Sequence, residues 1–168
     1  EIRSIMKITV ANKRLADKPL TKKDKGLYFS NLSFSTKEFD INEFKELVSN
    51  GFTVTYVYKD NEFRREDNYM KRNYVGTQFI IVDIDECEIS PREFIDDIKN
   101  KPTFFHTTFG NLTERKGFKY CFHLIYVLDQ FIYGEKRYKE VFDYLVSDYG
   151  GFVDKAATDP HRCFFTSN

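Results

Sequence analysis

Two aspartates near the middle of the chain stand two residues apart at the end of an apolar segment. Asp83 and Asp85 follow residues 78–82 (QFIIV) and enclose Ile84. Because residues i and i+2 of a β-strand point to the same side, both carboxylates would face one way while Ile84 faces the core. Two such carboxylates repel each other unless a proton or cation lies between them, and hard oxygen ligands suit Mg²⁺ or Mn²⁺. The alternative is a pair of solvated acids where a strand ends.

A third carboxylate and an arginine follow later in the sequence. Asp154 comes after an apolar pair, and Arg162 stands eight residues further on. Added to the two strand aspartates, Asp154 would complete a ligand set for two ions, which activate an attacking hydroxyl and neutralise a leaving pyrophosphate. The guanidinium of Arg162 has the fork geometry that binds a triphosphate. Asp159, beside Pro160, is the alternative third carboxylate, and both acids are otherwise ordinary loop residues.

A histidine lies within the apolar segment 119–129 (KYCFHLIYVLD). In a strand, His123 shares a face with Cys121, Ile125 and Val127. An imidazole among apolar neighbours is commonly a core histidine whose hydrogen bonds are satisfied within the fold. As a functional group, it would donate a hydrogen bond to a phosphate oxygen. The residues alone leave both interpretations open.

Strands along the chain would hold these residues in place. Alternating apolar residues, rich in β-branched and aromatic types, indicate where the strands are. The predicted strands cover residues 6–10, 27–34, 52–58, 78–86, 103–108 and 119–129, with a last strand at the end of the sequence. Between them we expect a charged connector over residues 60–73 and a polar hairpin loop over residues 110–117.

Three helices are predicted from their start and stop signals. Asp40 followed by Glu43 is a capping-box pattern, with a glycine just past the expected end of the helix. Ser90 and Glu93 repeat the pattern, with a proline at the first helical position. Apolar residues at helical spacing predict a third helix over residues 135–149.

This order of elements predicts an α+β fold in which helices flank a mainly antiparallel sheet. From residue 76 onward the pattern is that of a split βαβ unit like that of RNA-recognition folds, which would bring the Asp85 strand beside later antiparallel strands. The length of 168 residues fits a single domain. We expect residues 1–75 to form an N-terminal α/β lobe and residues 76–168 to form the lobe that carries the motifs.

Composition and charge exclude some classes of protein. Apolar residues make up 41% and aromatic residues 17% of the chain, which argues against disorder. The 26 basic residues balance the 26 acidic ones, so no whole-molecule field attracts nucleic acid or a membrane surface. The charges are nevertheless segregated, because residues 1–26 are rich in lysine and arginine and residues 83–97 are rich in acids.

The cysteines and the lengths of the apolar runs indicate the cellular compartment in which the protein is found. Three widely spaced cysteines, with no CxxC pair and no secretory signal, indicate a reducing, cytoplasmic setting. No apolar run approaches the ~20 residues of a membrane span, so we expect no membrane association. The sequence starts without Met and stops directly after a predicted strand, which indicates a segment of a longer protein.

Taken together, three of these stretches resemble the archaeo-eukaryotic primase superfamily, which includes primase-polymerases of plasmids, phages and mobile elements. The family pattern is a strand ending in DxD or DxE, a small-x-His element, and an apolar-Asp motif followed by an arginine. The matching stretches are Val82-Asp83-Ile84-Asp85, Cys121-Phe122-His123, and Val153-Asp154 with Arg162. Cys121 stands where the family often has serine, which puts its hydrogen-bonding role in doubt because a thiol is a weak donor.

The resemblance implies a primase-like catalytic core and a nucleotidyltransferase activity, that of a DNA primase or DNA-directed polymerase. Asp83, Asp85 and Asp154 would then hold two Mg²⁺ or Mn²⁺ ions, while His123 and Arg162 hold the phosphates of the incoming nucleotide. Lys119 would supplement the phosphate contacts, with Arg115 and Lys116 of the same loop as alternatives. The implied partners are nucleoside triphosphates, a single-stranded DNA template and, by family analogy, a helicase domain on the same full-length chain of a mobile-element replication protein.

The connector over residues 60–73 is the expected path of the template. Its basic residues are interleaved with Phe63 and Tyr69, which would stack on bases or else belong to the core. The basic residues are Arg64, Arg65, Lys71 and Arg72. Two other functions remain open, namely another DxD phosphoryl- or glycosyl-transfer enzyme and a non-catalytic nucleic-acid-binding module of a replication initiator.

Overall fold

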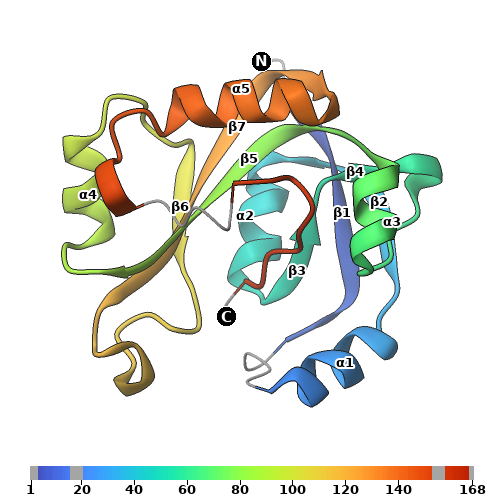
Figure 1. Ribbon diagram of the computed structural model, residues 1–168, viewed down its shortest axis with the longest axis horizontal. Helices are drawn as coiled ribbons and strands as arrows, with labels where there is room; N and C mark the ends of the chain where they lie inside the picture. Colours follow the sequence, from blue (N-terminus) through green and yellow to red (C-terminus); the bar gives the residue numbers. More distant parts are fainter. Residues whose placement is uncertain (1–3, 16–20, 153–157, 167–168) are drawn as a thin grey trace.

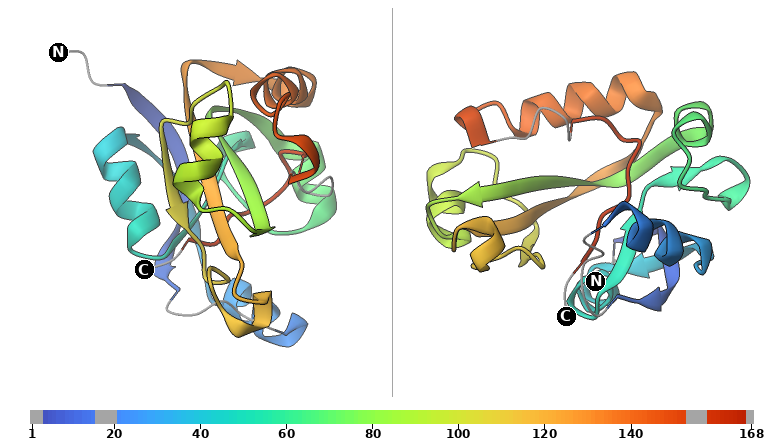
Figure 2. Two further views of the ribbon diagram at one scale, coloured as in Figure 1. Left: turned by 90° about the vertical axis from the view of Figure 1, so that its left-hand side faces the viewer. Right: turned by 60° about the horizontal axis from the view of Figure 1, so that its bottom comes forward.

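The computed structural model describes residues 4–15, 21–152 and 158–166 of the chain (Figure 1). It is an α+β fold in which helices flank two antiparallel sheets, so the coarse fold class predicted from the sequence is confirmed. Figure 2 shows the layers: a long helix lies on one side of the larger sheet, and the smaller sheet lies on the other side. The larger sheet is therefore covered by this helix on one face and, over part of its length, by the smaller sheet on the other.

The smaller sheet has the strand order β2-β1-β3, with antiparallel neighbours. Its strands and the two helices that connect them are β1 (Ile5–Arg14), α1 (Lys22–Ser30), β2 (Phe34–Asp40), α2 (Ile41–Ser49) and β3 (Phe52–Thr55). The capping box predicted at Asp40 is present, since the Asp40 carboxylate accepts the Glu43 N–H at 2.9 Å and the Glu43 carboxylate accepts the Asp40 N–H at 3.2 Å. Gly51 ends this helix with a φ of 81°.

The strand predicted over residues 27–34 is wrong, because residues 27–30 form the last turn of α1 and β2 begins only at Phe34. Thr21 caps the helix by accepting the N–H of Asp24 at 3.0 Å. The aromatic residues that gave the segment its strand-like pattern instead lie against the C-terminal part of the chain, where the Tyr28 and Phe29 rings each lie 6.0 Å from the Phe165 ring. Tertiary contacts thus outweigh local strand propensity here.

The larger sheet has the order β4-β5-β7-β6, and all its neighbours are antiparallel. The predicted strands near residues 78–86, 103–108 and 119–129 are all present. The elements are β4 (Val57–Tyr58), η1 (Lys59–Asn61), α3 (Asp67–Asn73), β5 (Tyr74–Cys87), α4 (Pro91–Asp97), β6 (Phe104–Thr107), η2 (Glu114–Lys116), β7 (Tyr120–Tyr133), α5 (Gly134–Leu145) and η3 (Gly150–Phe152). The connector expected over residues 60–73 therefore contains a helix, and the helix predicted to reach residue 149 stops at Leu145.

The strand predicted over residues 52–58 is divided at Tyr56, where the chain passes from the smaller sheet to the larger one. The Tyr56 side chain is fully buried at this junction. Its hydroxyl accepts the backbone N–H of Ile81 at 3.1 Å and lies 2.9 Å from the hydroxyl of Tyr138. These partners satisfy a polar group that would be costly to bury alone.

The split βαβ order is present in part. β5, α4, β6 and β7 follow it, and β5 pairs with β7. The position beside β5 is filled by β4, which comes earlier in the chain, and not by a strand after α5. The predicted last strand is reduced to one bridge, in which Phe164 pairs with Val54 of β3. The C-terminal segment is thereby held against the smaller sheet.

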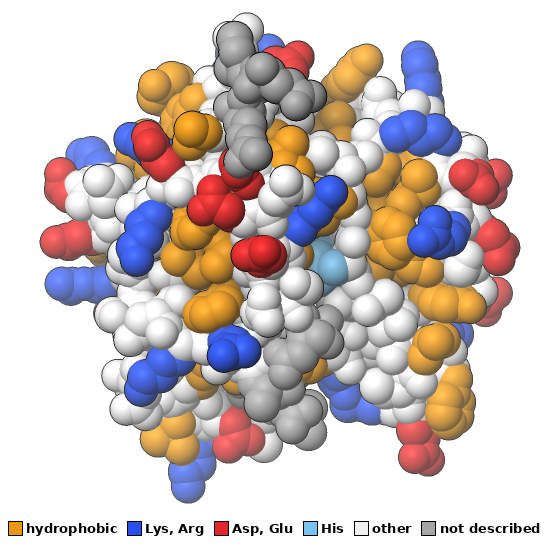
Figure 3. Space-filling view, turned by 180° about the vertical axis from the view of Figure 1, so that it is seen from behind, with side chains coloured by type: hydrophobic (Ala, Val, Ile, Leu, Met, Phe, Trp, Pro, Cys, Tyr) orange, Lys and Arg blue, Asp and Glu red, His pale blue; other side chains and the backbone are white. Residues whose placement is uncertain are grey.

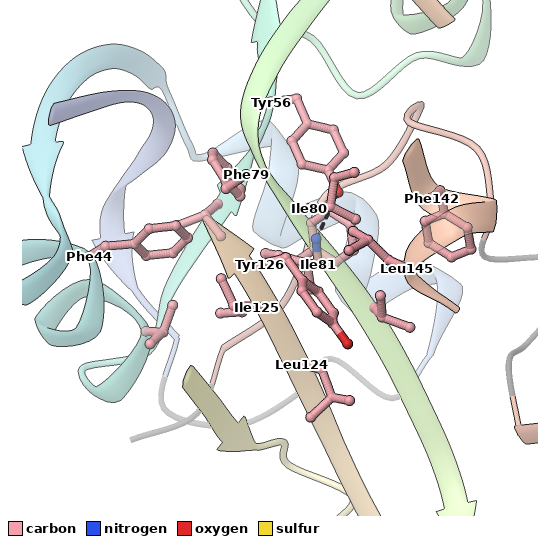
Figure 4. Packing of buried hydrophobic residues seen from close by; sticks show 14 of the residues in the cluster. Phe44, Tyr56, Phe79, Ile80, Ile81, Leu124, Ile125, Tyr126, Phe142 and Leu145 are labelled. Carbon is pink, nitrogen blue, oxygen red and sulfur yellow. Dashed lines mark hydrogen bonds between the residues drawn. The ribbon is translucent and has the colours of Figure 1, made fainter. Parts of the chain in front are cut away.

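The core lies on both sides of β5 (Figure 4). On one side, Phe44 of α2 packs edge-on against Phe79, with ring centroids 4.9 Å apart. On the other side lie Phe142 and Leu145 of α5. Residues 79–82 of β5 are all at most 1% exposed, which explains why this strand is a continuous apolar run and not an alternating one.

Candidate active site

The two strand aspartates lie where β5 leaves the core. Val82 and Ile84 are fully buried, whereas the side chains of Asp83 and Asp85 are 39% and 43% exposed. The alternation expected from strand geometry is therefore present, and both carboxylates line one cleft. The apolar neighbours of each aspartate anchor the strand, so the carboxylates are held on a rigid element.

This cleft, the Asp83 cleft, brings together three parts of the chain that are distant in sequence. β5 and β7 form its floor, the loop between β6 and β7 forms one wall, and the C-terminal segment forms another. Its lining residues are Asp83, Asp85, Thr108, Phe109, Gly110, Lys116, His123, Arg162, Cys163, Phe164 and Phe165. Figure 3 shows histidine surface near the centre of one face of the molecule, with acidic and basic side chains beside it.

Both oxygens of Asp85 already have partners. Oδ2 accepts a hydrogen bond from Nζ of Lys116 at 2.6 Å, and Oδ1 accepts one from Sγ of Cys121 at 2.9 Å. Although partial burial acts to raise it, these two hydrogen bonds hold the pKa of Asp85 below its usual value. The same contact raises the pKa of Lys116, and burial together with Asp85 raises the pKa of Cys121 to about 11. Asp85 is thus ionised, and the Cys121 thiol is protonated and able to donate.

His123 lies opposite Asp83 in the pairing of β5 with β7 and opposite His106 in the pairing of β6 with β7. Its side chain is only 6% exposed, and its Nε2 lies 3.4 Å from Oδ1 of Asp83. Its Nδ1 lies 3.1 Å from Nε2 of His106, whose own Nδ1 lies 3.2 Å from the carbonyl oxygen of Thr107. The imidazole of His123 is therefore held between a carboxylate and a second imidazole.

The order of these contacts sets which ring nitrogens carry protons. Burial and the neighbouring His123 lower the pKa of His106 to about 3, so His106 is neutral near pH 7. A carbonyl oxygen only accepts, so Nδ1 of His106 carries the proton and its Nε2 accepts the Nδ1–H of His123. The Nε2 of His123 consequently faces Asp83 and the cleft. The hydrogen bond between His106 and His123 was not predicted from the sequence, because it depends on the register of β6 on β7.

Arg162 reaches the cleft from the C-terminal segment. Its carbonyl oxygen accepts the Thr55 hydroxyl at 2.6 Å, which ties its backbone to β3. Its guanidinium donates from Nη2 to Oδ2 of Asp159 at 3.2 Å. Burial opposes the effect, but the N–H of His161 and the Arg162 charge lower the pKa of Asp159. Asp159 thus lies against Arg162 and is not among the residues that line the cleft.

The remaining predicted site residues are placed as follows. Asp154 lies outside the described residues, so its position relative to Asp83 is not part of the structure. Lys119 does not line the cleft, and its Nζ lies 3.8 Å from Oε1 of Glu88. Of the three basic loop residues considered, Lys116 is the one that lines the cleft.

The basic residues of the connector are divided between two environments. The Arg65 guanidinium lies 4.4 Å from the centre of the Phe29 ring, and Arg64 lies 5.9 Å from that of Tyr69. Lys71 and Arg72 are exposed in the last turn of α3. Phe63, left open between stacking and packing, is buried and belongs to the core.

Arg65 lines a second hollow, the Arg65 pocket, which adjoins the Asp83 cleft. The two share Arg162, Cys163 and Phe165 as a common wall. The other lining residues of the Arg65 pocket are Phe29, Arg65, Asp67, Met70 and His161. A basic and aromatic surface therefore leads up to the cleft that holds the aspartates.

Three general features of the described residues complete the description. Within residues 4–15, 21–152 and 158–166, no group of three or more His, Cys, Asp or Glu side chains is arranged to hold a metal ion. In the same part of the chain, no helix has the length and apolar character needed to cross a membrane. Cys87, Cys121 and Cys163 are free thiols.

Comparison of the chain with protein-family models, with curated proteins and with solved structures gives no match.

Proposed function

We propose that this chain is the catalytic domain of a metal-dependent nucleotidyltransferase that synthesises primers or extends DNA on a template, in the manner of the archaeo-eukaryotic primases that replicate mobile elements. One observation carries the proposal. Asp83, Asp85, His123 and Arg162 belong to three separate sequence motifs, and all four line the same cleft. Another DxD enzyme would need the aspartates but not the histidine and the arginine beside them.

The carboxylates fit a site for Mg²⁺ or Mn²⁺. Asp83 and Asp85 offer hard oxygen ligands on one side of a rigid strand, at a cleft open to solvent. Asp154 would add the third carboxylate. When bound, such ions supply neutralisation of the triphosphate and activation of the attacking hydroxyl.

The chain's own residues would position the nucleotide. His123 directs Nε2 into the cleft because its Nδ1 is held by His106, and a proton carried on Nε2 would be donated in a hydrogen bond to a phosphate oxygen. The Arg162 guanidinium would add a second, forked donor from the wall formed by the C-terminal segment. Catalysis would then rest on positioning and charge neutralisation, as in other phosphoryl transfers.

The Arg65 pocket supports a nucleic-acid partner. Arg65 stacked on Phe29 combines a cation with an aromatic surface, which is the combination that binds single strands without sequence preference. The pocket adjoins the Asp83 cleft through Arg162, so a template strand held there would lie beside the incoming nucleotide. Lys71 and Arg72 would add contacts to the phosphates along α3.

Primer extension with Mn²⁺ or Mg²⁺ tests the proposal. We expect Asp83→Asn and Asp85→Asn to lose synthesis by at least ~100-fold, the scale of removing an electrostatic group from a catalytic site, while the far-UV circular dichroism stays unchanged. Asp143→Asn, which neutralises an exposed acid on α5, is the matched control and keeps full activity. Full activity in either cleft variant would overturn the metal assignment. Binding of single-stranded DNA with no metal-dependent affinity for nucleotides would instead indicate a non-catalytic binding module.

A further inference from the structure

Lys116 occupies the position at Asp85 where a cation is expected. Its Nζ lies 2.6 Å from Oδ2 of Asp85, and its side chain is 20% exposed. It lines the same cleft as Asp83, His123 and Arg162. A carboxylate oxygen paired this closely with an ammonium group is not available to a metal ion, so the two cations would compete for Asp85.

The folded loop between β6 and β7 places Lys116 next to Asp85. η2 forms the tip, and Gly117 turns the chain with a φ of 63°. Internal hydrogen bonds define the loop, including Phe118 N–H to Thr113 O at 2.8 Å and Leu112 N–H to Lys119 O at 2.8 Å. Because these bonds lie within the loop, Lys116 can leave Asp85 by rotation of its own side chain without breaking the sheet.

The aliphatic part of the Lys116 side chain packs against Gly110. A Cβ placed on Gly110 would lie 3.1 Å from Cγ of Lys116 and 3.4 Å from Sγ of Cys121. The lysine stem therefore passes over a position without a side chain, next to the other hydrogen-bond donor to Asp85. The free volume of the cleft is about 100 Å³ in this state, below the ~300 Å³ at which small-molecule pockets usually begin. Movement of Lys116 would enlarge it.

We propose that Lys116 exchanges partners during the reaction: it neutralises Asp85 in the ligand-free protein, yields this carboxylate to the metal ion, and then binds the nucleotide's phosphates. The exchange rests on the proposed function, since it needs a metal ion and a triphosphate in the Asp83 cleft. An ammonium group on a flexible stem suits such a transfer, because it acts as a point charge toward either a carboxylate or a phosphate. Lys116 therefore binds phosphate in the substrate complex, and in the ligand-free protein it pairs with Asp85, a proposed metal ligand.

The exchange predicts opposite changes in two affinities measured on the same variant. Lys116→Met removes the competing cation, so Mn²⁺ alone should bind about two- to fivefold more tightly, the scale of an exposed ion pair. With Mn²⁺ present, a non-hydrolysable nucleoside triphosphate should bind about tenfold more weakly, the scale of a lost charged hydrogen bond. Titration calorimetry measures both, and electron paramagnetic resonance counts free Mn²⁺ independently.

Two further variants serve as controls. Lys139→Met removes a lysine from an exposed ion pair with Glu135 on α5 and should leave both affinities unchanged. Lys116→Arg keeps a cation in the loop and should stay close to the wild type in Mn²⁺ binding. All variants should unfold close to the wild-type temperature, because ion pairs as exposed as these contribute little to stability.

The outcomes separate the exchange from the proposed function. Tighter Mn²⁺ binding together with weaker nucleotide binding in Lys116→Met supports the exchange. Mn²⁺ binding by the wild type that is unchanged or weakened in Lys116→Met overturns the exchange and leaves the proposed function standing. Absence of Mn²⁺ binding in both proteins overturns the proposed function and the exchange together.

Discussion

His106 and His123 face each other across β6 and β7, with Nε2 of the first 3.1 Å from Nδ1 of the second. The rings meet edge to face, with centroids 4.8 Å apart and an interplanar angle of 80°. His106 does not line the Asp83 cleft, so it acts on the cleft through His123. It is a positioning residue, because its lone pair selects the nitrogen with which His123 faces Asp83.

Replacement of His106 should therefore weaken nucleotide binding from outside the cleft. His106→Phe keeps an aromatic ring but removes the acceptor, leaving the Nδ1–H of His123 buried without its partner, at a cost of ~1–3 kcal/mol. His106→Gln offers an amide oxygen as a substitute acceptor and should restore part of both stability and affinity. Urea denaturation and nucleotide titration measure the two effects. Equal nucleotide affinity in the phenylalanine and glutamine variants would count against the positioning role.

The neutral state of His106 should make folding stability depend on pH. Its pKa falls from 6.5 to about 3 on folding, through burial and then through His123, while the Thr107 carbonyl and then Asp83 act in the opposite direction. The unfolded chain therefore binds a proton between pH 6.5 and about 3 that the folded chain does not. The stability gained by keeping His106 neutral in the folded protein is fully present above pH 6.5 and is lost as the pH falls.

The test compares the wild type with His106→Gln between pH 5 and pH 7, where the carboxylates with lowered pKa remain ionised. We expect the free energy of unfolding of the wild type to fall more steeply with decreasing pH, by up to ~1.4 kcal/mol per pH unit. Parallel curves for the two proteins would show that His106 titrates alike in the folded and unfolded chains.

Phe44 should be among the residues on which the fold depends most. It is fully buried and packs edge-on against Phe79 of β5 and Phe104 of β6, thereby linking α2 to the larger sheet. Phe44→Ala should lower the free energy of unfolding by ~3–5 kcal/mol. Phe44→Leu, which keeps most of the buried area, should cost less than half as much. Guanidinium denaturation of both variants provides the measurement, and a loss below ~1 kcal/mol for the alanine variant would contradict the packing described.

Gly110→Ala should disturb the site with little effect on the fold. The added Cβ would lie 3.1 Å from Cγ of Lys116, which is part of a flexible side chain and can shift away. Gly110 is buried, but the closest contact is with this flexible stem, so we expect the free energy of unfolding to fall by only ~1 kcal/mol. Its Mn²⁺ affinity should change in the same direction as that of Lys116→Met, because displacement also frees Asp85. An affinity that moves the other way would mean that the stem is not displaced.

Local patterns in the sequence predicted the parts of the site that depend on one strand. Asp83 and Asp85 could be assigned to the same side because the side-chain period of a strand is fixed at two residues. The start of α2 could be predicted from Asp40 and Glu43, since a capping box involves only neighbouring residues. These features can be predicted because they depend only on residues that are close together in the sequence.

Features that depend on long-range packing could not be predicted in the same way. The partner of His123 follows from the register of β6 on β7, and nothing local to His106 specifies that register. The choice of Lys116 over Lys119 depends on how the loop folds back over Asp85. The segment containing Tyr28 and Phe29 has strand-like residues, but its rings pack against Phe165 at the other end of the chain.

The Asp83 cleft spans the junction of the two sheets. Of its lining residues, Arg162 is hydrogen-bonded to Thr55 of β3 and Phe164 forms a bridge with Val54 of β3. The aspartates and His123 belong instead to β5 and β7. A triphosphate bridging the arginine and the aspartates would thus add a noncovalent cross-link between the two layers. Substrate would then suppress partial unfolding in which one layer separates from the other, and slow hydrogen exchange in both sheets at once.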